Sequence, residues 1–159
     1  NGARADFGFS EDEIGSILYY DLSTRSKVAS ASGNTMEVTA SNDANRRWDP
    51  ELFKHVGEAR YKPWSFTLRI PGGGIVPTND LFLFRPPESG YEESYTFEVA
   101  EGEEGWVNQI EEQKFYFRTS DGNYGAFALK AAAGAGGSMG FRIKKLFFNP
   151  TGERDLENF

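Results

Sequence analysis

An Asp-Gly pair between two runs of alternating aromatic residues constrains the fold more than any other feature of this chain. Residues 113–119 (QKFYFRT) and 124–130 (YGAFALK) flank Asp121-Gly122. An Asp-Gly pair supplies the backbone angles of a tight hairpin turn, and alternation with period two is typical of half-buried strands. The pattern therefore predicts an antiparallel hairpin, which places this part of the chain in a β-sheet.

Short strand signals recur along the rest of the chain, separated by glycine and proline. Fourteen Phe, seven Tyr and three Trp need a core, whereas eighteen Gly and seven Pro interrupt long regular elements. These features predict an all-β, antiparallel, jelly-roll-like β-sandwich of about nine strands, folded as a single domain over residues 1–159. Besides the hairpin, strands are expected at residues 7–9, 15–22, 27–31, 35–40, 64–70, 79–85, 94–100 and 139–148, with 27–31 and 35–40 paired.

One face of these strands supplies the predicted core. In residues 64–70 (WSFTLRI) the alternation turns Trp64 inward together with Phe66 and Leu68. Residues 79–85 (NDLFLFR) are apolar on both faces, as in a central strand. The predicted core residues are Leu18, Phe66, Leu68, Phe82, Phe84, Phe97, Phe117, Phe127 and Phe141.

Two segments between the predicted strands depart from the strand pattern. At residues 49–57 (DPELFKHVG), Asp49 suits a helix N-cap, Pro50 the first helical position and Gly57 the end, so we predict one short helix of about two turns. Residues 131–137 (AAAGAGG) carry no anchoring side chain, and we predict a mobile connector there.

Charge and composition exclude several classes of function. The net charge of −7 argues against a nucleic-acid partner, and no apolar run approaches the length of a membrane span. The absence of Cys excludes disulfides, zinc-thiolate sites and thiol catalysis. Because the chain begins with Asn1 rather than Met, we interpret it as a mature or excised part of a larger protein. The composition fits an exported bacterial protein, extracellular or periplasmic, and it would also fit a cytosolic one. Other domains of a larger chain are candidate partners.

No set of catalytic residues converges in the sequence, and we predict that the protein is not an enzyme. Residues 136–140 (GGSMG) match the spacing of a nucleophile elbow, but no helix is expected after Ser138. Adjacent acids in polar loops do not give the facing carboxylates of a glycosidase. Calcium is the one cofactor that stays open. The acidic loop clusters and the oxygen-rich loop of Asn42, Asp43 and Asn45 offer the hard oxygen ligands that calcium prefers, but none has the spacing of an EF-hand.

Aromatic residues beside polar loops are the candidate ligand-binding residues. Flat rings stack on the C–H bonds of sugars, while guanidinium and carboxylate groups bind the hydroxyls. The alternative is that these rings close the ends of the sandwich core. The predicted site comprises Trp48 and Trp106, with Arg46, Arg47, Asp49, Tyr61 and Tyr91.

Two resemblances bear on function. Residues 115–127 (FYFRTSDGNYGAF) and 149–157 (NPTGERDLE) resemble exported bacterial β-sandwich domains, which are accessory parts of glycan-handling systems. The same hairpin resembles, more remotely, the haem-scavenging lipoproteins of Bacteroidetes, which hold haem iron through paired His or Met ligands. A chain with one His excludes the first pairing, and Met36 and Met139 lie in no motif of that family.

The favoured function is therefore a non-catalytic carbohydrate-binding or glycan-associated module that takes a polysaccharide as its partner. The alternative is a structural or protein-interaction domain of an exported assembly. An acidic module is expected to prefer neutral glycans, unless Arg46 and Arg47 dominate the site or calcium bridges the charges.

Overall fold

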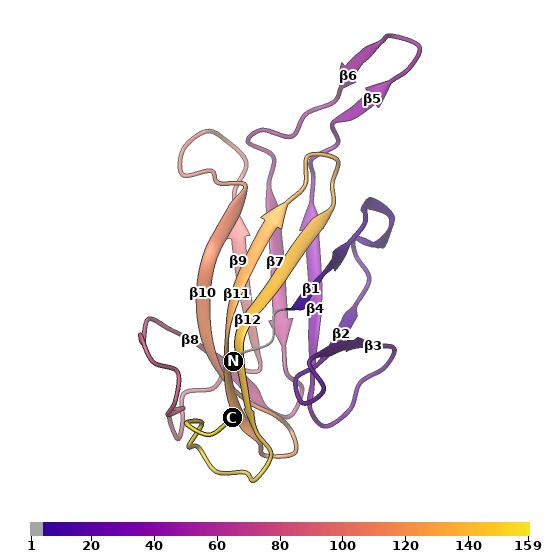
Figure 1. Ribbon diagram of the computed structural model, residues 1–159. Helices are drawn as coiled ribbons and strands as arrows, with labels where there is room; N and C mark the ends of the chain where they lie inside the picture. Colours follow the sequence, from indigo (N-terminus) through magenta and orange to yellow (C-terminus); the bar gives the residue numbers. More distant parts are fainter. Residues whose placement is uncertain (1–4) are drawn as a thin grey trace.

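The computed structural model describes residues 5–159 and shows two five-stranded antiparallel sheets packed face to face (Figure 1). The predicted all-β sandwich is confirmed, although residues 1–4 of the predicted domain lie outside the described part. The first sheet has the order β1 (Ala5–Phe9), β12 (Met139–Asn149), β11 (Tyr124–Ala133), β10 (Gln109–Arg118), β8 (Gly74–Thr78). The second has the order β3 (Ser26–Val28), β2 (Leu18–Asp21), β4 (Thr35–Asn42), β7 (Trp64–Arg69), β9 (Ser94–Val99).

The Asp-Gly hairpin forms as predicted and supplies the centre of the first sheet. Strands β10 and β11 pair antiparallel, with Phe115 opposite Phe127 and Phe117 opposite Gly125. A side chain at Gly125 would collide with the Phe117 ring and with the carbonyl oxygen of Phe147, so the close approach of the strands requires glycine there. The local turn signal and the core packing therefore agree on one register.

The core lies between the sheets and holds most of the predicted residues. Six of them are at most 4% exposed: Leu18, Phe66, Leu68, Phe117, Phe127 and Phe141. Phe97 is half-buried against this core, and Phe84 is half-buried elsewhere. Phe82 was predicted to lie in the core, and this prediction is wrong, since the residue is 73% exposed.

The predicted helix at residues 49–57 is also wrong, because this segment forms a projecting hairpin. Strands β5 (Arg47–Asp49) and β6 (Lys54–Val56) pair only with each other, and we call this hairpin the arm (Figure 1). The Asp49 carboxylate accepts hydrogen bonds from the backbone N–H groups of Glu51 at 2.9 Å and Leu52 at 3.2 Å. An aspartate that begins a helix and one that closes a turn make the same local bonds, and here no sheet lies beneath the segment to stabilise two helical turns.

Residues 79–85 are not the predicted central strand. They form an irregular loop whose Leu83 is buried against Tyr116, Ala126 and Leu156, on the outer face of the first sheet. Strand β8, which the sequence reasoning did not identify, pairs with β10 instead. Strand β8 contains Pro77, and an edge position tolerates a residue that cannot donate a ladder hydrogen bond.

Two smaller expectations are corrected. The segment at 27–31 does not pair with 35–40, because β2 lies between β3 and β4 and pairs with both. The alanines of the predicted connector extend β11, with Ala131 opposite Phe141 and Ala133 opposite Met139. The count thus rises to twelve strands, and the only helical element in the described residues is the 3-10 turn η1 (Glu11–Glu13).

Candidate functional site

Three loops meet at the end of the sandwich from which the arm emerges (Figure 1). The loop that carries the arm is joined to the β11–β12 turn by the Arg46 N–H, which donates to the carbonyl of Ala135 at 2.9 Å. It is joined to the β9–β10 loop by the Gly102 N–H, which donates to the carbonyl of Tyr61 at 3.0 Å. These backbone bonds fix the three loops relative to one another, and the sandwich strands position all of them.

The β11–β12 turn is anchored from the other sheet. The side-chain amide of Asn42, the last residue of β4, donates to the carbonyls of Gly134 at 2.9 Å and Ser138 at 2.8 Å. A turn rich in Gly and Ala thus receives its anchor from a distant strand. The sequence reasoning expected a mobile connector because this anchor lies more than ninety residues away along the chain.

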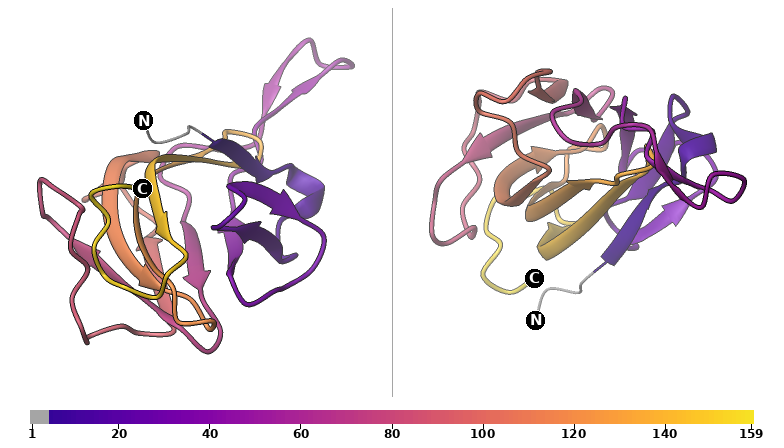
Figure 2. Two further views of the ribbon diagram at one scale, coloured as in Figure 1. Left: turned by 60° about the horizontal axis from the view of Figure 1, so that its bottom comes forward. Right: turned by 90° about the horizontal axis from the view of Figure 1, so that it is seen from above.

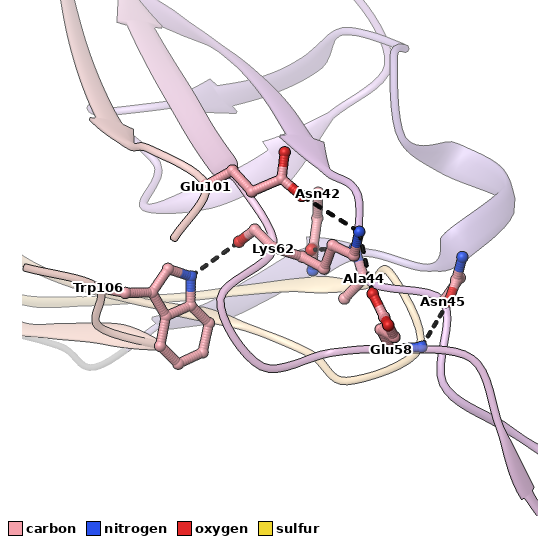
Figure 3. A network of polar contacts seen from close by, with 7 residues as sticks. All are labelled: Asn42, Ala44, Asn45, Glu58, Lys62, Glu101 and Trp106. Atoms are coloured by element: carbon pink, nitrogen blue, oxygen red, sulfur yellow. Dashed lines mark hydrogen bonds and ion pairs between the residues drawn. The ribbon is translucent and has the colours of Figure 1, made fainter. Parts of the chain in front are cut away.

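Trp106 is the half-buried aromatic residue at the centre of this end. Its indole N–H donates to the Lys62 carbonyl at 2.8 Å, as Figure 3 shows. Its ring meets the Tyr61 ring edge-on, with centroids 5.7 Å apart, and the Arg60 guanidinium lies 4.8 Å from the centroid of Tyr61. The polar atom of the indole is therefore satisfied within the protein, and the orientation of the ring is fixed from two sides.

Two hollows flank Trp106, and Arg60, Trp106 and Asn108 line both of them. The first has a volume of about 410 Å³ and the second about 610 Å³. The remaining lining of the first comprises Asn42, Ala44, Arg46, Ala59, Lys62, Trp64, Ala133, Gly134 and Ala135. That of the second comprises Tyr61, Glu103, Val107, Gln109 and Glu111.

The two hollows differ in charge. Arg46, Arg60 and Lys62 line the first, and no carboxylate is among its lining residues. Lys62 forms ion pairs with Glu58 at 3.2 Å and Glu101 at 3.3 Å, and these contacts, chiefly the one to Glu58, raise the pKa of the lysine above its ordinary value (Figure 3). The two arginines therefore set the sign of the first hollow.

The second hollow is mixed in charge. Its lining includes the carboxylates Glu103 and Glu111 beside the Arg60 guanidinium. Glu111 also forms an ion pair with Lys130 at 3.4 Å. Opposite charges and amide groups around an aromatic ring are suited to a ligand rich in hydroxyl groups.

The structure brings together some of the predicted site residues and separates others. Arg46, Tyr61 and Trp106 lie at the two hollows. Trp48, Arg47 and Asp49 lie on the arm, where 51% of Trp48 is exposed and its ring meets the edge of His55 with centroids 5.4 Å apart. These three line neither hollow, so the expected grouping of Trp48 with Trp106 is wrong.

Tyr91 was also grouped wrongly. It lies beside β8 at the opposite end of the sandwich, where its hydroxyl donates to the Pro87 carbonyl at 2.8 Å and its ring packs on Tyr124. Trp64 faces the core as predicted, is 2% exposed, and donates its indole N–H to the Val107 carbonyl at 2.7 Å.

The sequence reasoning missed Arg60, Lys62 and Asn108 as lining residues. Each is within two positions of Tyr61 or Trp106, which were predicted. Their proximity to an aromatic residue in a polar loop was the available signal. The same signal also selected the arm residues, because proximity along the chain does not tell which loops meet in space.

Neither a nucleophile elbow nor a cluster of metal-ligating imidazole and carboxylate groups is assembled among residues 5–159. No group of three or more His, Asp or Glu side chains is placed there to hold a metal ion. Ser138 lies in the turn between β11 and β12, so the helix that a nucleophile elbow requires does not follow it. In the same part of the chain, no helix is long and apolar enough to cross a bilayer.

The geometry of this end is the available guide to function. Comparison of the chain with protein-family models, curated proteins and solved structures finds no match.

Proposed function

We propose that this chain is a non-catalytic glycan-binding module of an exported bacterial protein, whose site is the end of the sandwich around Trp106. The observation that carries the proposal is a half-buried indole between two hollows, whose N–H is already bonded to the Lys62 carbonyl. An indole held in this way offers its ring to a ligand without leaving a polar atom unsatisfied. The C–H face of a sugar is the ligand chemistry that matches such a ring.

The size and continuity of the hollows fit a chain of sugars. Volumes of about 410 and 610 Å³ lie within the range of small-molecule sites. Because Arg60, Trp106 and Asn108 line both hollows, a ligand can occupy the two together. Consecutive sugar units on either side of one indole satisfy this arrangement.

Charge narrows the class of glycan. The sequence favours neutral glycans unless arginines dominate the site, and Arg46 and Arg60 do line the first hollow without a carboxylate. Arginine matches carboxylate and sulfate groups with two parallel hydrogen bonds. We therefore expect a uronic or sulfated sugar in the first hollow and a neutral sugar beside Glu103 and Glu111 in the second.

Truncation of the indole tests the proposal. Trp106→Ala removes the shared wall of the two hollows, and loss of an aromatic anchor of this kind costs about 1–3 kcal/mol of binding free energy. We expect the affinity for a soluble acidic oligosaccharide to fall about 5- to 150-fold in titration calorimetry. A soluble ligand of single-site length excludes effects of multivalent display. Measurements with and without calcium show whether the ion contributes.

Trp48→Ala is the matched control, because it removes the same side chain from a position outside both hollows. It should bind the oligosaccharide as the wild type does. Circular dichroism of both variants checks that the sandwich is retained. The proposal is wrong if no acidic or neutral glycan binds, or if Trp106→Ala and Trp48→Ala bind equally well.

The charge assignment has its own test. Arg46→Gln with Arg60→Gln should reduce the affinity for the acidic oligosaccharide more than for a neutral one of equal length. Added salt should have the same differential effect, because ions screen exposed charge pairs. An equal loss of affinity for both oligosaccharides would mean that the arginines bind sugar hydroxyl groups and not acidic groups.

A further inference from the structure

A groove lies on the outer face of the first sheet, where it crosses β11, β12 and β1. It has a volume of about 350 Å³. Three charged side chains and two small residues are among those that line it: Asp6, Lys130, Arg142, Ala132 and Gly140. Their neighbours along β11 and β12 belong to the core, namely Leu129, Ala131, Met139 and Phe141. Because side chains alternate along a strand, the groove is on the face turned away from the core.

The groove continues the second hollow across the strands. Ala132 lies between Gly140 of β12 and Gln109 of β10, and Gln109 lines the second hollow. Lys130 forms its ion pair with Glu111, another residue of that hollow. The second hollow and the groove therefore meet where β10 adjoins β11. From β10 to β1 the path crosses three strand spacings, about 14 Å.

Other segments of the chain cover the half of this outer face that lies away from the arm. The loop of residues 79–90 and the tail of residues 150–159 pack there through Leu83 and Leu156. Figures 1 and 2 place both segments at the end of the sandwich opposite the arm. The groove lies in the other half, beside the β11–β12 turn, and Gly140 within it is exposed. It is therefore open to a ligand that extends from the hollows.

The packing of the protein itself does not require the glycine of this groove. A side chain at Gly8, opposite Gly140 on β1, would collide with the Met139 carbonyl oxygen. A side chain at Gly140 would meet no atom of residues 5–159 within 4 Å apart from its chain neighbours, and its φ is not positive. Glycine weakens a strand interior, and it marks places where a ligand or another backbone approaches closely. A ligand in the groove accounts for a glycine at this position.

The charged side chains of the groove suit a ligand rich in hydroxyl groups. Lys130 and Arg142 lie opposite each other on β11 and β12, and both are partly exposed. Lys130 pairs with Glu111 at 3.4 Å, and Arg142 pairs with Asp6 at 2.7 Å. Lysine and arginine carry more donors than one ion pair uses, so both can also bind sugar hydroxyl groups. The groove thus combines opposite charges in the same way as the second hollow.

We propose that the groove continues the glycan site, so that a polysaccharide bound at Trp106 runs on from the second hollow across β11 and β12 to β1. This inference rests on the proposed function and adds that the module binds an interior stretch of a long chain. A short oligosaccharide fills the hollows and leaves the groove empty. The affinity should therefore rise with the length of the ligand until the groove is filled.

Oligosaccharides of different length test the inference. Titration calorimetry compares the tetrasaccharide and the decasaccharide of hyaluronan, in which uronic and neutral sugars alternate. The decasaccharide should bind the wild type about 10- to 100-fold more tightly, the factor that corresponds to one further hydrogen bond to a charged group. A longer ligand also offers more binding registers, so the gain has to be compared between variants.

Gly140→Thr fills the floor of the groove with a residue that suits a strand. It should bind the tetrasaccharide as the wild type does and lose the gain for the decasaccharide, while its stability in urea is retained or raised. Lys130→Gln should also weaken binding of the decasaccharide. Lys27→Gln is the matched control, because it removes the same charge from an exposed position on β3 of the second sheet.

The outcomes separate this inference from the proposed function. Binding that depends on Trp106 but is equally tight for both lengths overturns the groove and leaves the glycan module intact. The groove is also overturned if Gly140→Thr keeps the whole gain, or if Lys27→Gln reduces it as much as Lys130→Gln. If neither hyaluronan fragment binds, the inference falls, and the Trp106→Ala comparison with other glycans decides the proposed function.

Discussion

The centre of the sandwich and the arm are both antiparallel hairpins that carry aromatic residues, but the environments of these residues are opposite. Phe115, Phe117 and Phe127 are fully buried between two sheets, whereas Trp48 and Phe53 are 51% and 81% exposed. The arm has two strands and no second layer, so no surface covers its aromatic side chains. The tertiary arrangement therefore decides whether the aromatic residues of a hairpin stabilise the fold or remain available for contacts.

The largest effect is expected at the centre of the sandwich. The Phe127 ring lies 5.2 Å from that of Phe115 and 6.0 Å from that of Phe117, between centroids. Phe127→Ala leaves a cavity that these neighbours cannot fill, and the free energy of unfolding should fall by about 3–5 kcal/mol. Urea denaturation measures this change. A loss below about 1 kcal/mol would mean that Phe127 contributes no more to stability than an exposed aromatic residue of the arm.

The buried region also contains a local defect. Tyr20 is 1% exposed, and its hydroxyl has no hydrogen-bond partner among residues 5–159. Tyr20→Phe removes the unsatisfied group and keeps the ring against Phe7, 5.2 Å away between centroids. The free energy of unfolding should rise by about 1 kcal/mol, since an unpaired buried hydroxyl costs about that much or more. Equal or lower stability of the variant would contradict this account of Tyr20.

The same tyrosine predicts a dependence on alkaline pH. Burial raises the pKa of Tyr20 from 10.0 to about 12. Between these values the unfolded chain releases the proton and the folded chain keeps it, so stability is lost as the pH rises through this window. The slope is about 1.4 kcal/mol per pH unit for one such group. Burial also raises the pKa values of Tyr91 and Tyr116, so the wild type should lose more stability than Tyr20→Phe, which in turn should still lose some.

The sequence predicted those parts of the fold that depend on neighbouring residues. The Asp-Gly turn and the alternation around it are local, and they correctly predicted β10, β11 and the burial of Phe117 and Phe127. Asp49 shows the limit of this reasoning. Its carboxylate accepts the two hydrogen bonds of a helix cap, but the same bonds also close a turn. The outcome is decided by the absence of a second layer on which a short helix could pack.

The candidate site shows the same limit. Trp106 and Tyr61 were predicted because both are aromatic residues in polar loops, and the structure places them 5.7 Å apart between ring centroids. Tyr91 has the same local features and lies at the other end of the sandwich. Which loops share an end depends on strand order, and the sequence gives no short-range signal for the pairing of β8 with β10.

The smallest effect on stability is expected on the arm, and it gives the sharpest form of the comparison. Leu52→Ala truncates a side chain that is 57% exposed in the turn of the arm, so the free energy of unfolding should change by no more than about 0.5 kcal/mol. Leu83→Ala is the matched substitution at a leucine that is 3% exposed, and it should cost about 2–5 kcal/mol. Urea denaturation of both variants beside the wild type measures these changes. Equal losses for the two leucines would show that the arm packs on the sandwich in solution.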